Sequence, residues 1–227
     1  MHFIEAAIKF MIAGGIWVAP IMLVGAIGMG ITVERYIKLL RAEISNRKMW
    51  DKLQPILHEG DFDKAREMTY NDKSYVSQLL SVGLERQGTV RRREDFEIAM
   101  DEVMMSIVPQ LEKRTPYTSL FANIATLLGL LGTIMGLIHA FEAVATAAPS
   151  EKAALLTASI SEAMSCTALG LMVAMPMLSA NLFLNLKAST IIDGLEMASL
   201  KTVNAIASFN AKNRNQEAAG NGEKKTH

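Results

Sequence analysis

The stretch from residue 159 to residue 185, SISEAMSCTALGLMVAMPMLSANLFLN, decides the fold of this chain. It is long enough to cross a bilayer, because a spanning helix needs roughly 20 mostly apolar residues. It also carries one carboxylate, Glu162, although an ionisable group at the centre of such a helix costs about 2.5–3.5 kcal/mol or more. Such a group faces protein or water and indicates a function. The stretch therefore predicts a membrane span with a functional acidic residue.

The composition of the chain separates into apolar and charged blocks. Its 227 residues are 50% hydrophobic and 20% charged, and 23 basic residues balance 23 acidic ones, so net charge gives no argument for a nucleic-acid partner. The single cysteine, Cys166, excludes an intrachain disulfide. The four histidines are scattered, without metal-ligand spacing or a nucleophile–base pair. We therefore expect no metal, no cofactor and no enzymatic activity.

Two further apolar runs predict two further spans. Residues 11–33 exceed the usual apolar core of a signal peptide (roughly 7–15 residues) and lack a basic leading segment, so they are interpreted as a retained transmembrane helix. The predicted spans are residues 11–33, 119–147 and 159–186, with a turn at 148–158 between the second and the third.

The remaining segments are expected to be helical or disordered. Residues 1–10 read as an amphipathic lead-in, and 34–118 as a charge-rich helical domain that Pro55 and the turn at 58–61 interrupt. Residues 187–212 predict an amphipathic helix, and the polar tail 213–227 predicts disorder. The expected fold is an all-α membrane protein, with three transmembrane helices and long helices that extend into a helical cytoplasmic domain.

The basic residues around the spans predict their orientation. Lysines and arginines follow the first and third spans and precede the second, whereas the opposite side carries only Lys9 and Lys152. The positive-inside rule therefore predicts a periplasmic N-terminus and 148–158 turn, with residues 34–118 and the C-terminus in the cytoplasm.

Hydroxyl groups and the carboxylate are expected near one another in the membrane. Antiparallel packing of the second and third spans brings Thr133 and Thr167 to comparable depths. Glu162 lies about 7–8 Å nearer the outer face and is rotated by about 140° from Thr167 around the helix, so it faces a neighbouring helix. A carboxylate beside hydroxyls in a partly wet space exchanges protons. Proton conduction is the simplest inference, although composition alone does not exclude Na⁺ as the conducted ion.

Two motifs resemble those of a known family. Residues 129–136, GLLGTIMG, resemble its GLLGTVxG signature, and 160–171, ISEAMSCTALGL, followed by Pro176, resemble I-x-E-A-L-x-x-T-A-x-G-L. Val33-Glu34-Arg35 is similar to the family's ending of the first span. The family is ExbB/TolQ/MotA, the inner-membrane channel subunits that convert proton motive force into mechanical work. The resemblance covers all three spans, and the loop layout favours the ExbB/TolQ branch.

The resemblance implies an assembly and a proton path. It implies a homopentamer in the lipid of the bacterial inner membrane, around two copies of an ExbD- or TolR-like single-span subunit with a membrane aspartate, and a TonB- or TolA-like partner beyond. Thr133 and Thr167 would then line the proton path, with Glu162 beside it. The expected helix-packing residues are Gly129, Gly132, Gly136 and Gly170.

Three residues depart from the family's pattern, and we expect them to be accessory groups of the site. Thr126 stands where many relatives have proline, which removes a kink and adds a hydroxyl. His139 and Glu142 lie in the outer half of the second span. Histidine titrates near neutral pH, so His139 is a candidate for receiving protons. The favoured alternative is an interfacial His139 bonded to Glu142 or to water.

Two other functions remain open from the sequence. A non-conducting membrane scaffold would use the glycines and threonines only to pack helices, and a flagellar or gliding-type stator subunit would use the same path for another machine. The downstream machine itself is not indicated by any residue pattern.

Overall fold

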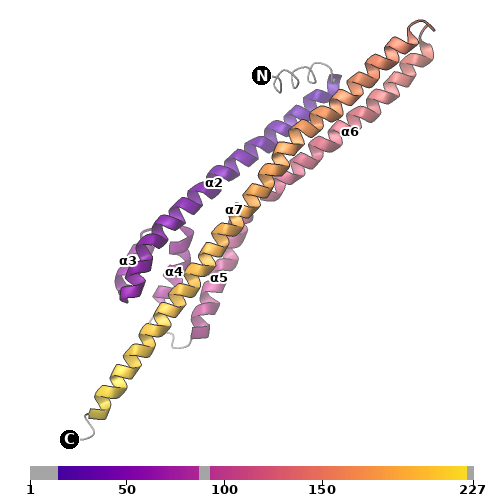
Figure 1. Ribbon diagram of the computed structural model, residues 1–227. Helices are drawn as coiled ribbons and strands as arrows, with labels where there is room; N and C mark the ends of the chain where they lie inside the picture. The colour runs from indigo at the N-terminus through magenta and orange to yellow at the C-terminus, as the bar shows by residue number, and fades with distance from the viewer. Residues whose placement is uncertain (1–14, 87–92, 224–227) are drawn as a thin grey trace. The chain divides into compact units, whose positions relative to one another are not determined.

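A computed structural model describes residues 15–86 and 93–223, with side chains through residue 211. The predicted lead-in 1–10 and the start of the first span lie outside these residues. Every regular element in the described ranges is a helix, which confirms the all-α prediction (Figure 1). The elements are η1 (Gly15–Trp17), α2 (Val18–Glu59), α3 (Phe62–Tyr70), α4 (Tyr75–Glu85), α5 (Arg93–Glu112), α6 (Thr115–Thr146) and α7 (Lys152–Glu223).

Three helical stretches of the described chain are long and apolar enough to cross a membrane. They are Gly15–Glu59, Arg93–Thr146 and Lys152–Ala211, and each contains one predicted span. Helices α2 and α7 continue without interruption beyond those spans into charge-rich sequence. The predicted three-span architecture with long extending helices is therefore confirmed.

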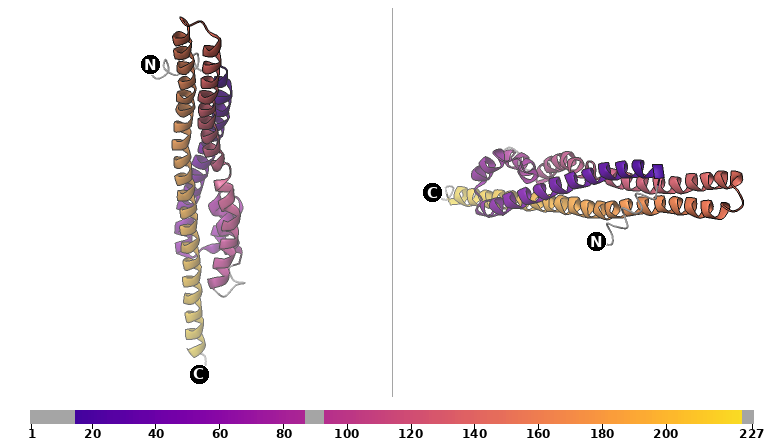
Figure 2. Two further views of the ribbon diagram at one scale, coloured as in Figure 1. Left: turned by 90° about the vertical axis from the view of Figure 1, so that its right-hand side faces the viewer. Right: turned by 90° about the horizontal axis from the view of Figure 1, so that it is seen from above.

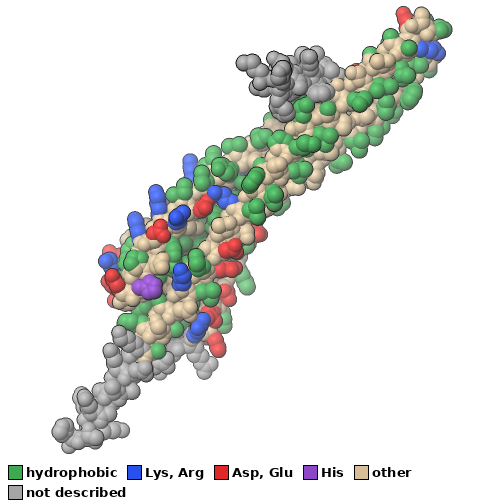
Figure 3. Space-filling model, in the orientation of Figure 1, with side chains coloured by type: hydrophobic (Ala, Val, Ile, Leu, Met, Phe, Trp, Pro, Cys, Tyr) green, Lys and Arg blue, Asp and Glu red, His purple; other side chains and the backbone are tan. Residues whose placement is uncertain are grey.

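The chain divides into two compact units. We call the first the membrane unit (Met1–Tyr36 and Arg114–Asn185) and the second the polar unit (Ile37–Lys113 and Leu186–His227). Figure 3 shows charged side chains gathered over the polar unit and hydrophobic ones over the membrane unit. Helices α2 and α7 contribute to both units.

Helix α6 and the first part of α7 form an antiparallel hairpin in the membrane unit (Figure 2). The connection between them, residues 147–151, is shorter than the predicted turn at 148–158. Helix α7 begins early because the backbone N–H groups of Glu151 and Lys152 already bond the Ala148 carbonyl, at 2.9 and 3.3 Å. The alanines and leucines that follow are strong helix formers and continue the helix.

The chain breaks once near Pro55 and residues 58–61, as predicted, but Pro55 itself lies inside its helix. Helix α2 passes through Pro55 and ends at Glu59, in the predicted turn at 58–61. Burial explains the difference, since Leu53, Ile56 and Leu57 around the proline are at most 8% exposed and hold the last turn in place. Helix α7 likewise continues to Glu223, through residues for which disorder was predicted. The sequence QEAA at 216–219 favours helix and extends α7.

Gly60 ends α2 with a left-handed backbone conformation, φ +78°. A Cβ added there would also lie 3.0 Å from the ring of Phe209, which packs edge-on against Phe62 at a centroid distance of 5.1 Å. The turn between α2 and α3 therefore requires glycine for both its backbone and its space.

Gly60→Ala is expected to lower the thermal unfolding midpoint of the full chain in detergent. The left-handed conformation alone costs an L-residue about 1–2 kcal/mol, and the Phe209 ring must also move. Gly194→Ala is the matched control, because Gly194 lies inside α7 with no atom within 4 Å of an added Cβ. The control is expected to equal or exceed the wild-type midpoint. Equal midpoints for Gly60→Ala and the wild type would contradict the assigned turn.

Candidate functional site

Thr133 and Thr167 meet at the contact between α6 and α7, as antiparallel packing predicts. Their hydroxyl groups are hydrogen-bonded to each other. The Thr133 hydroxyl also lies 3.2 Å from the carbonyl oxygens of Gly129 and Ala163, and the Thr167 hydroxyl lies 3.0 Å from that of Gly129. The pair therefore joins the two helices through backbone carbonyls on both sides.

The hydrogen-bonding capacity of the Thr133–Thr167 pair is limited by its two hydroxyl hydrogens. Each threonine hydroxyl has one hydrogen to donate and two lone pairs to accept with. Either hydroxyl can donate to the other, and each has a backbone carbonyl oxygen within reach, so the chain supplies acceptors for both hydrogens. Lone pairs remain. In this state the pair accepts a hydrogen bond from an approaching donor and has none to give.

Four glycines let α6 and α7 approach closely enough for the two hydroxyls to meet. A Cβ added at any of them would come within 2.8–3.1 Å of an atom on the facing helix, closer than ordinary van der Waals contact. These neighbours are the Ala125 carbonyl oxygen for Gly170, the Cys166 carbonyl oxygen for Gly129, Cys166 Cβ for Gly132 and Ala163 Cβ for Gly136. Small residues in membrane helices allow this approach of backbones.

Glu162 lies apart from the threonine pair, as its rotation around the helix predicts. Its side chain is exposed and lines a cavity of about 80 Å³, whose lining includes neither threonine. Within the described chain the carboxylate has no hydrogen bond and no ion pair. Gly15, at φ +60°, brings its backbone against this carboxylate, so closely that an added Cβ would overlap Oε1. The site is thus a free carboxylate covered in part by the start of the first span.

The accessory residues occupy three different environments. His139 is exposed and lines the same cavity as Glu162. Glu142 is exposed and does not line it, and within the described residues no hydrogen bond joins Glu142 to His139. The structure thus shows no bond between His139 and Glu142, and the other form of that alternative, a bond to water, stays a prediction. Thr126 bonds the Ala122 carbonyl of its own helix at 3.2 Å and does not reach the threonine pair.

An apolar layer closes the α6–α7 contact on the side away from residues 147–151. Ala122, Ala125, Ala174 and Met177 form a cluster in which each residue is at most 1% exposed. The side chains of this cluster bring no polar group to the contact between α6 and α7.

A second polar layer lies beyond the apolar one and was not predicted. The Thr32 hydroxyl lies 3.5 Å from the Thr118 hydroxyl and bonds the Gly28 carbonyl at 2.8 Å. Nearby in sequence, Asn181 donates to the Thr115 carbonyl at 2.9 Å, and Arg114 pairs with Glu34 at 2.9 Å. Glu34 belongs to the Val33-Glu34-Arg35 motif, but no sequence pattern indicates these contacts, because they join distant segments.

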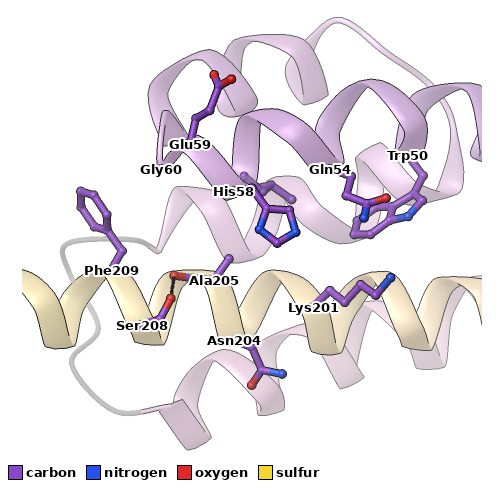
Figure 4. Close-up of a pocket in the computed structure, with 11 residues that line it drawn as sticks. Trp50, Gln54, His58, Glu59, Gly60, Lys201, Asn204, Ala205, Ser208 and Phe209 are labelled. Carbon is purple, nitrogen blue, oxygen red and sulfur yellow. Dashed lines mark hydrogen bonds between the residues drawn. The ribbon is translucent and has the colours of Figure 1, made fainter.

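A larger cavity, about 810 Å³, lies in the polar unit between the end of α2 and α7 (Figure 4). Trp50, Gln54 and His58 come from α2, and Lys201 from α7 places its ammonium 5.8 Å from the centroid of the Trp50 ring. The sequence did not indicate this cavity. Within the described residues, no group of three or more histidines, cysteines or carboxylates is placed to hold a metal ion.

Comparisons with a family model and with known proteins both find similarity to ExbB- and TolQ-type proteins. A sequence model of the MotA/TolQ/ExbB proton channel family matches residues 71–197, which include Thr133, Glu162 and Thr167. The chain is 23% identical over 176 residues to the putative biopolymer transport protein ExbB-like 3 of Synechocystis, covering 77% of this chain and 83% of that protein. It is 33% identical over 93 residues to the Tol-Pal system protein TolQ of Haemophilus influenzae, covering 41% of this chain and 40% of that protein.

Proposed function

Because the chain belongs to the MotA/TolQ/ExbB proton channel family, we propose that it is an ExbB/TolQ-type subunit of an ion-driven motor in the inner membrane. It couples proton motive force to mechanical work on an envelope partner, and it acts as a channel subunit rather than an enzyme. The observation that carries this proposal is Glu162, a carboxylate in an apolar spanning helix with no protein partner within the described residues. Such a group is costly unless its charge is used.

The proton path requires a second kind of subunit. The threonine pair has used both its hydrogens, and the apolar layer formed by Ala122, Ala125, Ala174 and Met177 closes the interior of the hairpin. A carrier from outside the chain, such as a membrane aspartate, meets both conditions, because its protonated form donates to the free lone pairs of the threonines. We therefore propose a homopentamer around two ExbD- or TolR-like single-span subunits, with a TonB- or TolA-like protein as the driven partner.

The proposed orientation follows the distribution of basic residues. The N-terminus and residues 147–151 lie in the periplasm, and the polar unit and the C-terminus in the cytoplasm. In that orientation Glu162 lies on the periplasmic side of the threonine pair, where protons enter, and the Thr32–Thr118 layer lies on the cytoplasmic side. The large exposed hydrophobic side chains of α6, such as Leu127, Ile134 and Phe141, face lipid or neighbouring subunits.

The decisive experiment is purification of the complex from its native membrane through a tag on this chain, followed by reconstitution into liposomes. We expect a single-span protein with a membrane aspartate to co-purify. We also expect an imposed potassium diffusion potential to drive proton uptake, read by an internal pH-sensitive dye and unchanged when sodium is replaced by choline. Absence of both the partner and the flux would favour the scaffold function, for which the close glycine contacts alone suffice.

A further inference from the structure

We propose that His139 is a proton-transfer residue that exchanges protons with Glu162 through water in the cavity they share. The inference rests on the proposed function, because it assigns to His139 a step on the path by which protons reach Glu162. It names a group on α6 that supplies the carboxylate on α7, on the periplasmic side of the threonine pair.

Three elements build the cavity. His139 comes from α6, Glu162 and Ser159 from α7, and Trp17 from η1, which covers the cavity from the side of the first span. Gly136, three residues before His139, packs against Ala163, the residue that follows Glu162. This close helix contact brings the helix positions that carry the two ionisable residues together at one cavity.

Both side chains keep their polar atoms available. In the described part of the chain, neither His139 nor Glu162 has a hydrogen bond or an ion pair, and both are exposed. No other exposed titratable group of the described chain lines this cavity. Glu142 on α6 does not line it, and Cys166 on α7 lines it as a buried thiol. The described residues of η1 contribute only Ile16 and Trp17, which do not titrate. His139 and Glu162 are therefore the two exposed ionisable groups of this lining.

The cavity is the right size for a short water bridge. A water molecule takes about 30 Å³ in the liquid, so the volume of about 80 Å³ accommodates about two. Ser159 and the two ionisable side chains supply the polar partners that such water needs. The remaining lining residues are Ile16, Trp17, Gly132, Gly136, Ala163 and Cys166, which are small or largely apolar.

The transfer step balances without any further reactant. Protonated His139 gives a ring N–H proton to a cavity water, and that water passes another proton to a carboxylate oxygen of Glu162. The N–H bond breaks and an O–H bond forms, leaving a neutral imidazole, a neutral carboxyl group and the same water. The imidazole then takes a proton from the periplasmic side and is ready for the next transfer.

The test uses the complex purified from its native membrane and reconstituted into liposomes, with proton flux as the measurement. His139→Ala is expected to lower flux by about 10²-fold, the lower end of what a positioned acid–base group contributes. Added imidazole is expected to restore flux in His139→Ala, because it enters the space left by the side chain. His139→Gln keeps hydrogen bonding and volume, and it is expected to lose flux without rescue. Glu162→Gln is measured alongside.

The outcomes separate this inference from the proposed function. Wild-type flux in His139→Gln, or a loss in His139→Ala that imidazole does not restore, would overturn the role of His139 even if Glu162→Gln is inactive. Wild-type flux in Glu162→Gln would overturn the proposed function itself. The elution volume of each variant complex and its co-purified partner show that assembly is intact, and His139→Gln preserves the test if the alanine variant does not assemble.

Discussion

Glu162→Gln is expected to reduce proton flux through the reconstituted complex to the level of protein-free liposomes, with assembly unchanged. Glutamine keeps the shape and hydrogen bonding of glutamate but neither binds nor releases a proton. The expected loss is at least about 10²-fold, since a positioned proton-transfer group typically contributes 10²–10⁴-fold. Glu162→Asp keeps the carboxylate on a shorter side chain and is expected to retain part of the flux.

The matched control is Glu142→Gln, which neutralises another exposed carboxylate of the same hairpin. Glu142 does not line the cavity, so its variant is expected to conduct as the wild type does. The loss in Glu162→Gln will not come from unfolding. The carboxylate has no ion pair or hydrogen bond within the described chain, so neutralising it removes a desolvation cost and breaks no protein contact. If Glu162→Gln conducts protons as well as Glu142→Gln and the wild type, the proposed proton-channel function is wrong.

The sequence predicted those parts of the site that depend on one helix or one hairpin. The three spans follow from the length of the apolar runs, and the meeting of Thr133 and Thr167 follows from antiparallel packing of neighbouring helices. Glu162 departs from the threonine face because 3.6 residues per turn place it there. These are properties of local periodicity, which a single sequence displays directly.

The parts that the sequence missed depend on contacts between distant segments. Gly15 lies against the Glu162 carboxylate because its own backbone has a positive φ just before α2 begins. No residue pattern in the sequence predicts this conformation. The Thr32–Thr118 contact joins two spans separated by the polar unit. Pro55 was predicted to contribute to the break at the end of α2, but the helix continues past it to Glu59, where Leu53 and Leu57 are buried. The first two differences depend on contacts between distant segments, and the third depends on burial.

Gly170→Val is expected to separate α6 from α7 and to abolish flux together with stability. An added Cβ at Gly170 would lie 2.8 Å from the Ala125 carbonyl oxygen and 3.0 Å from Gly129 Cα. Both are backbone atoms that no rotamer change can move, so the helices must shift apart. Overpacking typically costs about 1–3 kcal/mol and occasionally more. The shift also breaks the hydrogen bond between Thr133 and Thr167.

The measurements are the thermal unfolding midpoint in detergent and the proton flux of the reconstituted complex. Gly30→Ala is the matched control, because an added Cβ at Gly30 of α2 has no atom within 4 Å, and its midpoint is expected to equal or exceed that of the wild type. Adding Ala125→Gly to Gly170→Val is expected to restore nothing, since the obstruction is the carbonyl and not the methyl group. Recovery in that double variant would show that side chains, rather than backbones, set the spacing of the hairpin, and a wild-type midpoint in Gly170→Val would show that the two helices do not approach closely there.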